Sequence, residues 1–293
     1  TLVMVPPDHT YYREMSQKHG DVAPEILNLN MGAPYQPFSR APQIRYRFTS
    51  NNFMLTAAAI WQSQYLSVGP KTNKPGETST QKSQEFMKKS CVPEFYLGVD
   101  YKRPGLIAGA GLHVSSITPR TQSETENAVY FVNERVTGIS GEAHVKYTKE
   151  DWLVSAKTVL GTNLTQTSTV GGYGITSIDE VTGKQQYSPL RTSSTWVNVA
   201  YGKKWRPALF FGYLKNLGAT KEVPYGALGT GTTLDQLFTG TAELTYNIPH
   251  WKFGAEYSLC NAWYGDEFDA KAKAINSHSI LNHRIVLVAL FQF

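Results

Sequence analysis

Between Gln43 and Phe293 the chain repeats one pattern, in which two alternating runs are joined by a very short turn and followed by a long polar segment. Alternation of apolar and polar side chains predicts β-strands, and the short turns predict antiparallel pairs. A soluble sandwich gives no reason for short and long connections to alternate, because both ends of its sheets face the same water. A transmembrane barrel explains this alternation, since its turns are short on one side of the membrane and its loops are long on the other.

The turns and loops define the expected strands. The short turns are Asn51-Asn52, Arg103-Pro104-Gly105, Lys149-Glu150-Asp151, Lys203-Lys204 and Pro249-His250, all residues that favour tight reversals. The long segments run over 69–92, 121–128, 165–192, 221–236 and 266–281. The strands are then 1–5, 43–50, 53–68, 93–102, 105–118, 129–147, 152–164, 193–203, 207–220, 237–248, 252–265 and 282–293. We therefore expect an all-β fold, an antiparallel transmembrane β-barrel with about twelve strands in this chain, as one domain over residues 1–293.

Each run has one apolar face and one charged face. In the run 43–50, Ile44, Tyr46 and Phe48 share one face, and Arg45 and Arg47 share the other. Bulky rings flank the short turns on the apolar face, at Phe48, Phe53, Tyr147, Trp152, Tyr201, Trp205, Tyr246 and Trp251. Amphipathic rings settle at the depth of lipid headgroups, so this row predicts an aromatic girdle at a membrane interface. The alternative is a soluble sandwich whose rings pack at the bottom of its core.

Composition removes several other classes. The chain is 17% charged and 12% aromatic, which does not fit a disordered chain. The longest apolar run, Ile285 to Phe291, is far shorter than the roughly 20 residues of a membrane-spanning helix. Cys91 and Cys260 are too few for a disulfide scaffold, and we expect both to be free because their strands lie far apart around a wall. The basic residues are dispersed singly along strands, which excludes nucleic acid as a partner.

Charged side chains on the polar face are candidates for the lining of a pore. They are Arg45, Arg47, Lys102, Lys146, Lys157, Lys215, Glu142 and Glu243, with Lys252, Asp100 and Glu256 beside them. Their small excess of Lys and Arg predicts a modest preference for anions. Arg45 and Arg47 are the first choice because they lie two residues apart on one face, beneath the longest loop. The simpler interpretation of any single charge is that it keeps the channel wet.

That loop covers residues 6–42 and mixes charged and aromatic residues with Pro and Gly. A long barrel loop can fold into the lumen and narrow it, which would add Arg13, Lys18 and Arg40 to the selectivity candidates. A short helix is expected from Thr10 to His19. The alternative is an external, solvated loop.

Catalytic and metal chemistry find little support. Asp266, Glu267 and Asp269 could bind Ca²⁺ weakly or pair as carboxylates of an external protease, but a solvated acidic loop explains them as well. His113 and Ser115 share one face, as an outer-membrane lipase on the lipid side would need, yet no activating carboxylate is expected nearby. We therefore expect no enzyme and no cofactor.

Several stretches resemble a known family. The segment Asn30 to Arg45, NMGAPYQPFSRAPQIR, resembles a stretch of the porin-like outer-membrane proteins of Bacteroides-type bacteria, to which dicarboxylate-channel-like porins are related. Gly212 to Gly218, Ala262 to Asp266 and Asn282 to Phe293 are similar to later strands of that family. The resemblance implies a homotrimeric, water-filled channel in contact with outer-membrane lipid. It also implies a wall of up to sixteen strands, of which this chain is the C-terminal portion, with the first strands missing or supplied by a second chain.

Two hypotheses of function follow. The first is an outer-membrane porin for passive diffusion of small hydrophilic solutes, with a modest anion preference. The alternative is a structural or docking barrel subunit of an envelope complex, with a closed or incidental pore. A pore needs the 6–42 loop inside the barrel, whereas a docking subunit needs it outside or bound to a partner.

Overall fold

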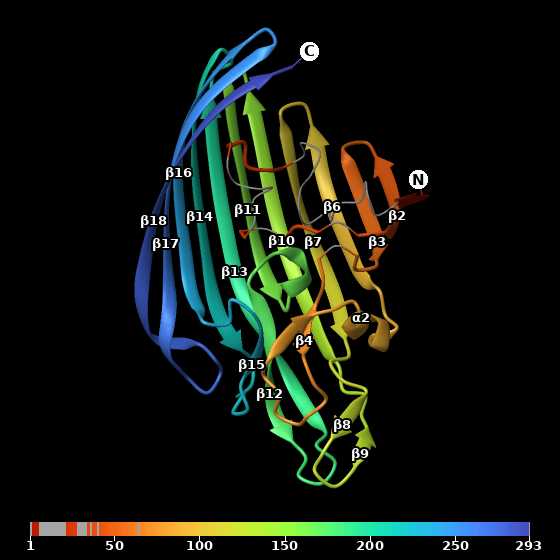
Figure 1. Ribbon diagram of the computed structural model, residues 1–293. Helices are drawn as coiled ribbons and strands as arrows, with labels where there is room; N and C mark the ends of the chain where they lie inside the picture. The colour runs from red at the N-terminus through yellow and green to blue at the C-terminus, as the bar shows by residue number, and fades with distance from the viewer. Residues whose placement is uncertain are drawn as a thin grey trace.

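A computed structural model describes residues 2–5, 22–27, 34–35, 37–39, 41–63 and 65–292, the first of these by backbone alone. In the described residues one antiparallel sheet has fourteen strands, and twelve of them form a path in which each strand pairs with the next (Figure 1). They are β1 (Leu2–Val5), β2 (Gln43–Ser50), β3 (Phe53–Ile60), β6 (Glu94–Arg103), β7 (Leu106–Ile117), β10 (Val136–Lys149), β11 (Trp152–Thr162), β13 (Gln185–Tyr201), β14 (Trp205–Ala219), β16 (Leu234–Ile248), β17 (Trp251–Phe268) and β18 (Ala274–Phe291). The sheet is curved, and β1 and β18 form its two edges in the described part of the chain.

The smaller elements lie in the long connections, at the lower end of Figure 1. They are β4 (Val68–Pro70), β5 (Thr80–Lys82), α2 (Glu85–Ser90), β8 (Gln122–Glu124), β9 (Val129–Phe131), η3 (Thr165–Thr167), β12 (Gly171–Ile178) and β15 (Ala227–Thr230). β12 pairs with β13 and with β15, so two of these connections extend the main sheet. Among the described residues, no helix has the length and apolar character to cross a membrane.

The five short turns occur where the sequence predicts them. Asn51, Glu150 and His250 each take a positive φ, of 50°, 54° and 64°, which tight reversals between strands require. Gly105 also has a positive φ, and a Cβ atom there would lie 2.5 Å from the carbonyl oxygen of Thr148. That turn therefore needs glycine.

Two predicted loops are wrong. In the segment 165–192, β12 forms and β13 begins at Gln185, eight residues before the expected strand 193–203. The segment 266–281 was expected to be a long polar connection, but β17 continues to Phe268 and β18 begins at Ala274. Pairing persists through Gly265 with Ser277 and Glu267 with Asn276, with register shifts on either side of Glu267. Polar residues can pair as strands beyond the apolar part of a wall, so composition misplaces the end of this hairpin.

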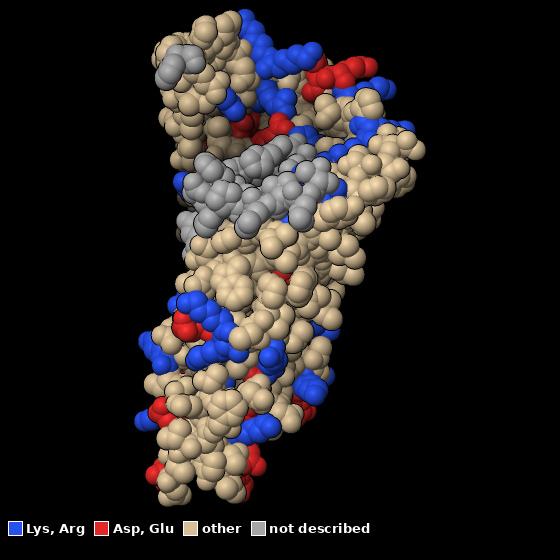
Figure 2. All heavy atoms as spheres, turned by 90° about the vertical axis from the view of Figure 1, so that its right-hand side faces the viewer, with Lys and Arg blue, Asp and Glu red and all other residues tan. Residues whose placement is uncertain are grey.

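The outer face of the sheet exposes large apolar side chains and the inner face buries polar ones, which is the reverse of a soluble protein. On the outer face, Ile44, Leu112 and Ile139 are 53%, 58% and 63% exposed. On the inner face, Ser155 and Asn198 are completely buried. Figure 2 shows charged side chains at the upper end and over the lower half of the face in view. Large apolar surfaces exposed to water are unfavourable, so this outer face fits contact with lipid.

The aromatic row also lies where predicted, on the outer face beside the short turns. Cross-strand neighbours touch there: the ring centroids of Trp152 and Tyr201 are 4.7 Å apart, and those of Trp205 and Tyr246 are 4.5 Å apart. Three of these four rings are exposed, and that of Tyr246 is half-buried. Cys91 and Cys260 are both free, as expected.

Candidate functional site

Residues 22–27, which we call the inner segment, lie against the inner face of the sheet. The backbone N–H of Glu25 donates to Asn198 Oδ1 on β13, at 2.8 Å. The Glu25 carboxylate accepts from Lys146 Nζ on β10 at 3.0 Å and from Arg206 Nη2 on β14 at 2.7 Å. One acidic side chain thus joins two cationic side chains on strands that are three apart along the sheet path, with β11 and β13 between them.

The inner segment also reaches β16 and β17. The backbone N–H of Leu27 donates to Glu243 Oε2 at 2.7 Å and to Glu256 Oε2 at 2.8 Å. Glu243 and Glu256 are direct cross-strand partners. Two carboxylates side by side repel each other, so a shared donor stabilises this pair. Ile26 packs against Leu153, Ala200 and Ala208 of the wall.

A second described part of the 6–42 loop packs inside as well. The Tyr35 hydroxyl donates to Thr239 Oγ1 at 2.6 Å. The backbone carbonyl oxygen of Tyr35 accepts from Ser194 Oγ at 2.8 Å. Burial raises the pKa of Tyr35, so its hydroxyl stays a neutral donor. The ring lies over Gly212, where a Cβ would be 2.7 Å away, and beside Phe210. Gly212 is thus part of the cradle for this ring.

A charged cluster spans β6, β7, β10 and β11 on the inner face. His144 Nδ1 lies 2.9 Å from Glu142 Oε2, and His144 Nε2 lies 2.9 Å from Asp100 Oδ1. Lys157 Nζ is 3.3 Å from Glu142, and the Tyr96 hydroxyl donates to Glu142 at 3.0 Å. Because both ring nitrogens of His144 face carboxylates, the arrangement fits an imidazolium. Two positive and two negative groups then balance one another.

This cluster depends on two glycines of β7. Asp100 and Tyr96 come from β6 and their partners come from β10, so both contacts cross β7. A Cβ on Gly109 would lie 2.4 Å from Asp100 Oδ1, and one on Gly111 would lie 2.1 Å from the Tyr96 hydroxyl. Only a strand without side chains at these two positions admits the contacts.

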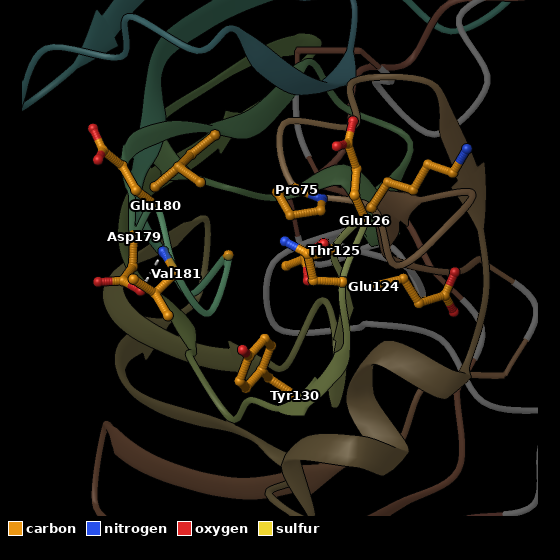
Figure 3. A pocket seen from close by; sticks show the side chains of 12 residues that line it. Pro75, Glu124, Thr125, Glu126, Tyr130, Asp179, Glu180 and Val181 are labelled. Carbon is orange, nitrogen blue, oxygen red and sulfur yellow. Dashed lines mark hydrogen bonds between the residues drawn. The ribbon is translucent and has the colours of Figure 1, made fainter.

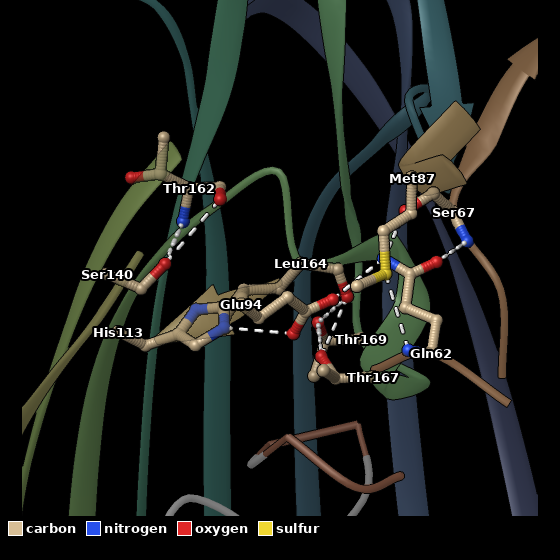
Figure 4. Close-up of polar contacts among 10 residues, drawn as sticks. All are labelled: Gln62, Ser67, Met87, Glu94, His113, Ser140, Thr162, Leu164, Thr167 and Thr169. Carbon is tan, nitrogen blue, oxygen red and sulfur yellow. Dashed lines mark hydrogen bonds and ion pairs between the residues drawn. The ribbon is translucent and has the colours of Figure 1, made fainter. Parts of the chain in front are cut away.

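A further buried network lies nearer the long loops (Figure 4). His113 Nε2 is 3.0 Å from Glu94 Oε2, and Gln62 Nε2 donates to Glu94 Oε1 at 2.7 Å. His113 and Ser115 therefore face the inside of the sheet rather than lipid, and a carboxylate does lie beside His113, contrary to the sequence-based expectation. The sequence pattern did not reveal Glu94 as a partner of His113, because the two residues lie on different strands, β6 and β7. The inward direction removes the basis for a lipase on the lipid side.

The register places most predicted pore-lining residues on the inner face. Arg45, Arg47, Lys102, Lys146, Lys157, Glu142 and Glu243 all lie there, with Lys252, Asp100 and Glu256. Their role in selectivity stays a prediction. Arg13, Lys18 and Arg40, and the helix expected over Thr10 to His19, lie outside the described residues.

Lys215 was expected on the inner face, but it lies on the outer face. It pairs with Gln236 on the same face as Tyr213 and Phe211, which is the outer face, and its Nζ lies 2.6 Å from Asp235 Oδ1. The inward positions of this strand include Phe210 and Leu214, which pack with the ring of Tyr35. Polarity alone therefore misassigned the face of β14, because apolar side chains occur on both of its faces.

The acidic residues Asp266, Glu267 and Asp269 were expected to form a solvated loop or a weak Ca²⁺ site. Asp266 lies 2.6 Å from His278 Nδ1, Glu267 accepts from Asn276, and Asp269 accepts from the backbone N–H groups of the turn that follows it. Each carboxylate has its own partner, so they do not converge. Among the residues that the structure describes, no group of three or more His, Cys, Asp or Glu side chains could hold a metal ion.

The long-loop end carries a hollow of about 930 Å³ between the β8–β9 hairpin and the turn after β12 (Figure 3). Glu124, Glu126, Asp179 and Glu180 line it with Lys74. Hydrogen bonds from the Thr182 hydroxyl and N–H lower the pKa of Asp179, which keeps this carboxylate charged. The hollow is thus acidic, although nothing in it identifies a ligand.

Sequence reasoning missed Glu25, Asn198 and Arg206. Glu25 and Arg206 are 181 residues apart, and no local pattern relates them. Arg206 carried the one available signal, since it occupies an inward position directly after a short turn. A count of inward charges on every strand would have included it.

Comparison with known proteins supports the fold. No family model and no curated protein matches the chain. The outer membrane channel DcaP of Acinetobacter baumannii has a TM-score of 0.59 at 12% identity, over 94% of this chain and 69% of that one. Lower scores link it to OmpF of Salmonella typhi in complex with daunomycin (0.49, 14% identity, 95% and 70%) and to a trimer form of OmpT of Vibrio cholerae (0.45, 11%, 87% and 65%). The chain spans about two thirds of the length of these proteins. Its sheet has the fold of an outer-membrane β-barrel wall.

Proposed function

We propose that the protein is a channel of the bacterial outer membrane through which small hydrophilic solutes diffuse passively. The observation that carries this proposal is the reversed distribution of side chains, with large apolar residues exposed outside and charged residues buried inside. An outer apolar band suits lipid, and a polar inner face suits a water-filled lumen. The similarity to DcaP, an outer membrane channel, supports the same function. The proposal is for transport and not for catalysis.

We also propose a modest preference for anions. Arg45 and Arg47 lie two residues apart on the inner face of β2, and Lys102 faces the same side of β6. Rings of Lys and Arg favour anions, and a narrow channel with low-dielectric walls increases the effect of a small excess. Changing Arg45 and Arg47 to Glu should shift the reversal potential in a salt gradient towards cations. An unchanged reversal potential would remove both residues from the selectivity filter.

The assembly belongs to the same proposal. In the described part of the chain, β1 and β18 form the edges of the wall. We propose a homotrimer in outer-membrane lipid, as the family resemblance implies. Native mass spectrometry of the detergent-solubilised protein should give three copies, and a monomer would contradict this part.

The alternative function is a docking barrel with a closed pore. The specific observation in its favour is that the inner segment is held by side chains of β10, β13, β14, β16 and β17, so it lies across part of the lumen. Swelling of proteoliposomes separates the two functions. A channel lets vesicles swell in small sugars at rates that fall with solute size, whereas a docking barrel gives the same trace as empty vesicles.

A further inference from the structure

The contacts of the inner segment are of a kind that can be released. Among the described residues, no backbone-to-backbone hydrogen bond joins 22–27 to the wall. Its attachments are two ion pairs at Glu25 and three hydrogen bonds from backbone N–H groups to side chains. Apolar packing adds to them: Ile26 packs against the wall, Val22 is buried in one cluster with Trp196 and Phe210, and Leu27 lies over Gly254. A strand of the wall, in contrast, is held along its whole length by ladder hydrogen bonds.

The ion pairs at Glu25 are also accessible to salt. The side chains of Glu25, Lys146 and Arg206 are 40%, 15% and 25% exposed. Partly exposed ion pairs are weakened by dissolved ions, and each contributes little alone. Glu25 is the only described acidic residue of the inner segment, so its carboxylate is the single point at which both cations hold it.

We propose that the inner segment is a releasable latch, in which Glu25 fastens it to Lys146 and Arg206 across the lumen and loss of this pairing lets it leave the wall. The idea rests on the proposed channel function for its consequence, since a released segment widens the lumen. Release also takes the carboxylate of Glu25 away from Lys146 and Arg206, which makes the inner face more positive. Opening of the latch should therefore increase both conductance and anion preference.

A thiol probe tests the latch without any need for conduction. Ala200 is 1% exposed and packs against Ile26, so a cysteine there is covered while the segment is in place. In a protein with Cys91→Ser and Cys260→Ser, the thiol introduced by Ala200→Cys should react slowly with a water-soluble maleimide. Addition of Glu25→Gln should speed the reaction about tenfold, because labelling of a covered site follows the population of the open form. High salt should speed the reaction in the parent and have little effect on the variant.

The control is Glu180→Gln, which removes the same charge from an exposed turn at the far end of the molecule. It should leave the labelling rate unchanged. Lys146→Gln is a second route to release and should act in the same direction as Glu25→Gln. Equal labelling rates in the parent, Glu25→Gln and Lys146→Gln would overturn the latch, whether or not the protein conducts. Faster labelling in vesicles that do not swell would retain the latch and reject the channel.

Discussion

The position of Leu209 offers a quantitative test of lipid contact. On the outer face of β14, Leu209 lies midway between Trp205, in the aromatic row, and Tyr213. Eight residues of strand, at about 3.3 Å each and tilted by about 40°, cover about 20 Å of membrane depth. This approaches the apolar band of about 25 Å in outer-membrane barrels. Leu209 is therefore close to the midplane.

Leu209→Arg should lower the free energy of unfolding by about 2 to 4 kcal/mol, because a guanidinium near the midplane loses its hydration. The assay is urea unfolding of the protein in lipid vesicles, followed by tryptophan fluorescence. The control is Val181→Arg, since Val181 is 70% exposed in the turn between β12 and β13, and a change in water should alter stability by less than about 0.5 kcal/mol. Equal, small effects at both sites would place the outer face in water and contradict contact with lipid.

Three further predictions concern the interior and the loops. Gly111→Ala should cost about 1 to 3 kcal/mol in the same assay, because its Cβ would lie 2.1 Å from the Tyr96 hydroxyl, whereas Gly141→Ala, whose nearest atom is 3.6 Å away, should be tolerated. His113→Ala should cost about 1 to 3 kcal/mol because it removes the imidazole that bonds to the buried carboxyl of Glu94, while His278→Ala in an exposed pair should cost less than about 1 kcal/mol; similar losses would contradict the distinction. Because hydrogen bonds lower the pKa of Asp179, their contribution exists above the ordinary carboxyl pKa and is lost as pH falls through the lowered value; Thr182→Val should raise the pKa of Asp179 in an NMR titration, and no change would exclude these bonds as the cause.

The fold could be predicted from sequence because each strand carries its own signal. Alternation fixed which of Ile44 and Arg45 faces outward, and the short turns fixed the pairing order. Alternation predicts the wrong face where apolar residues lie on both faces of a strand. In β14, Phe210 and Leu214 face inward and Lys215 faces outward. Alternation fails again beyond the apolar band, where polar residues of β17 and β18 continue to pair.

The site could be predicted only in part for a different reason. Inward direction is a local property, so Lys146 and Glu243 could be placed on the inner face without a structure. Their partner segment could not, because Glu25 meets Lys146 across 121 residues of chain and Leu27 meets Glu243 across 216. Such contacts depend on the path of a loop through three dimensions, which neither alternation nor spacing records.

The most direct test of the channel is conductance in a planar lipid bilayer. The purified protein is added on one side at a fixed voltage, and a variant with Leu209→Arg, which should insert poorly, serves as the control for contaminating pores. An anion-preferring channel should give discrete, reproducible current steps whose size rises with salt concentration and whose reversal potential in a salt gradient lies on the anion side. A silent membrane at high protein load, with insertion verified by protease protection, would contradict the channel and favour a docking barrel.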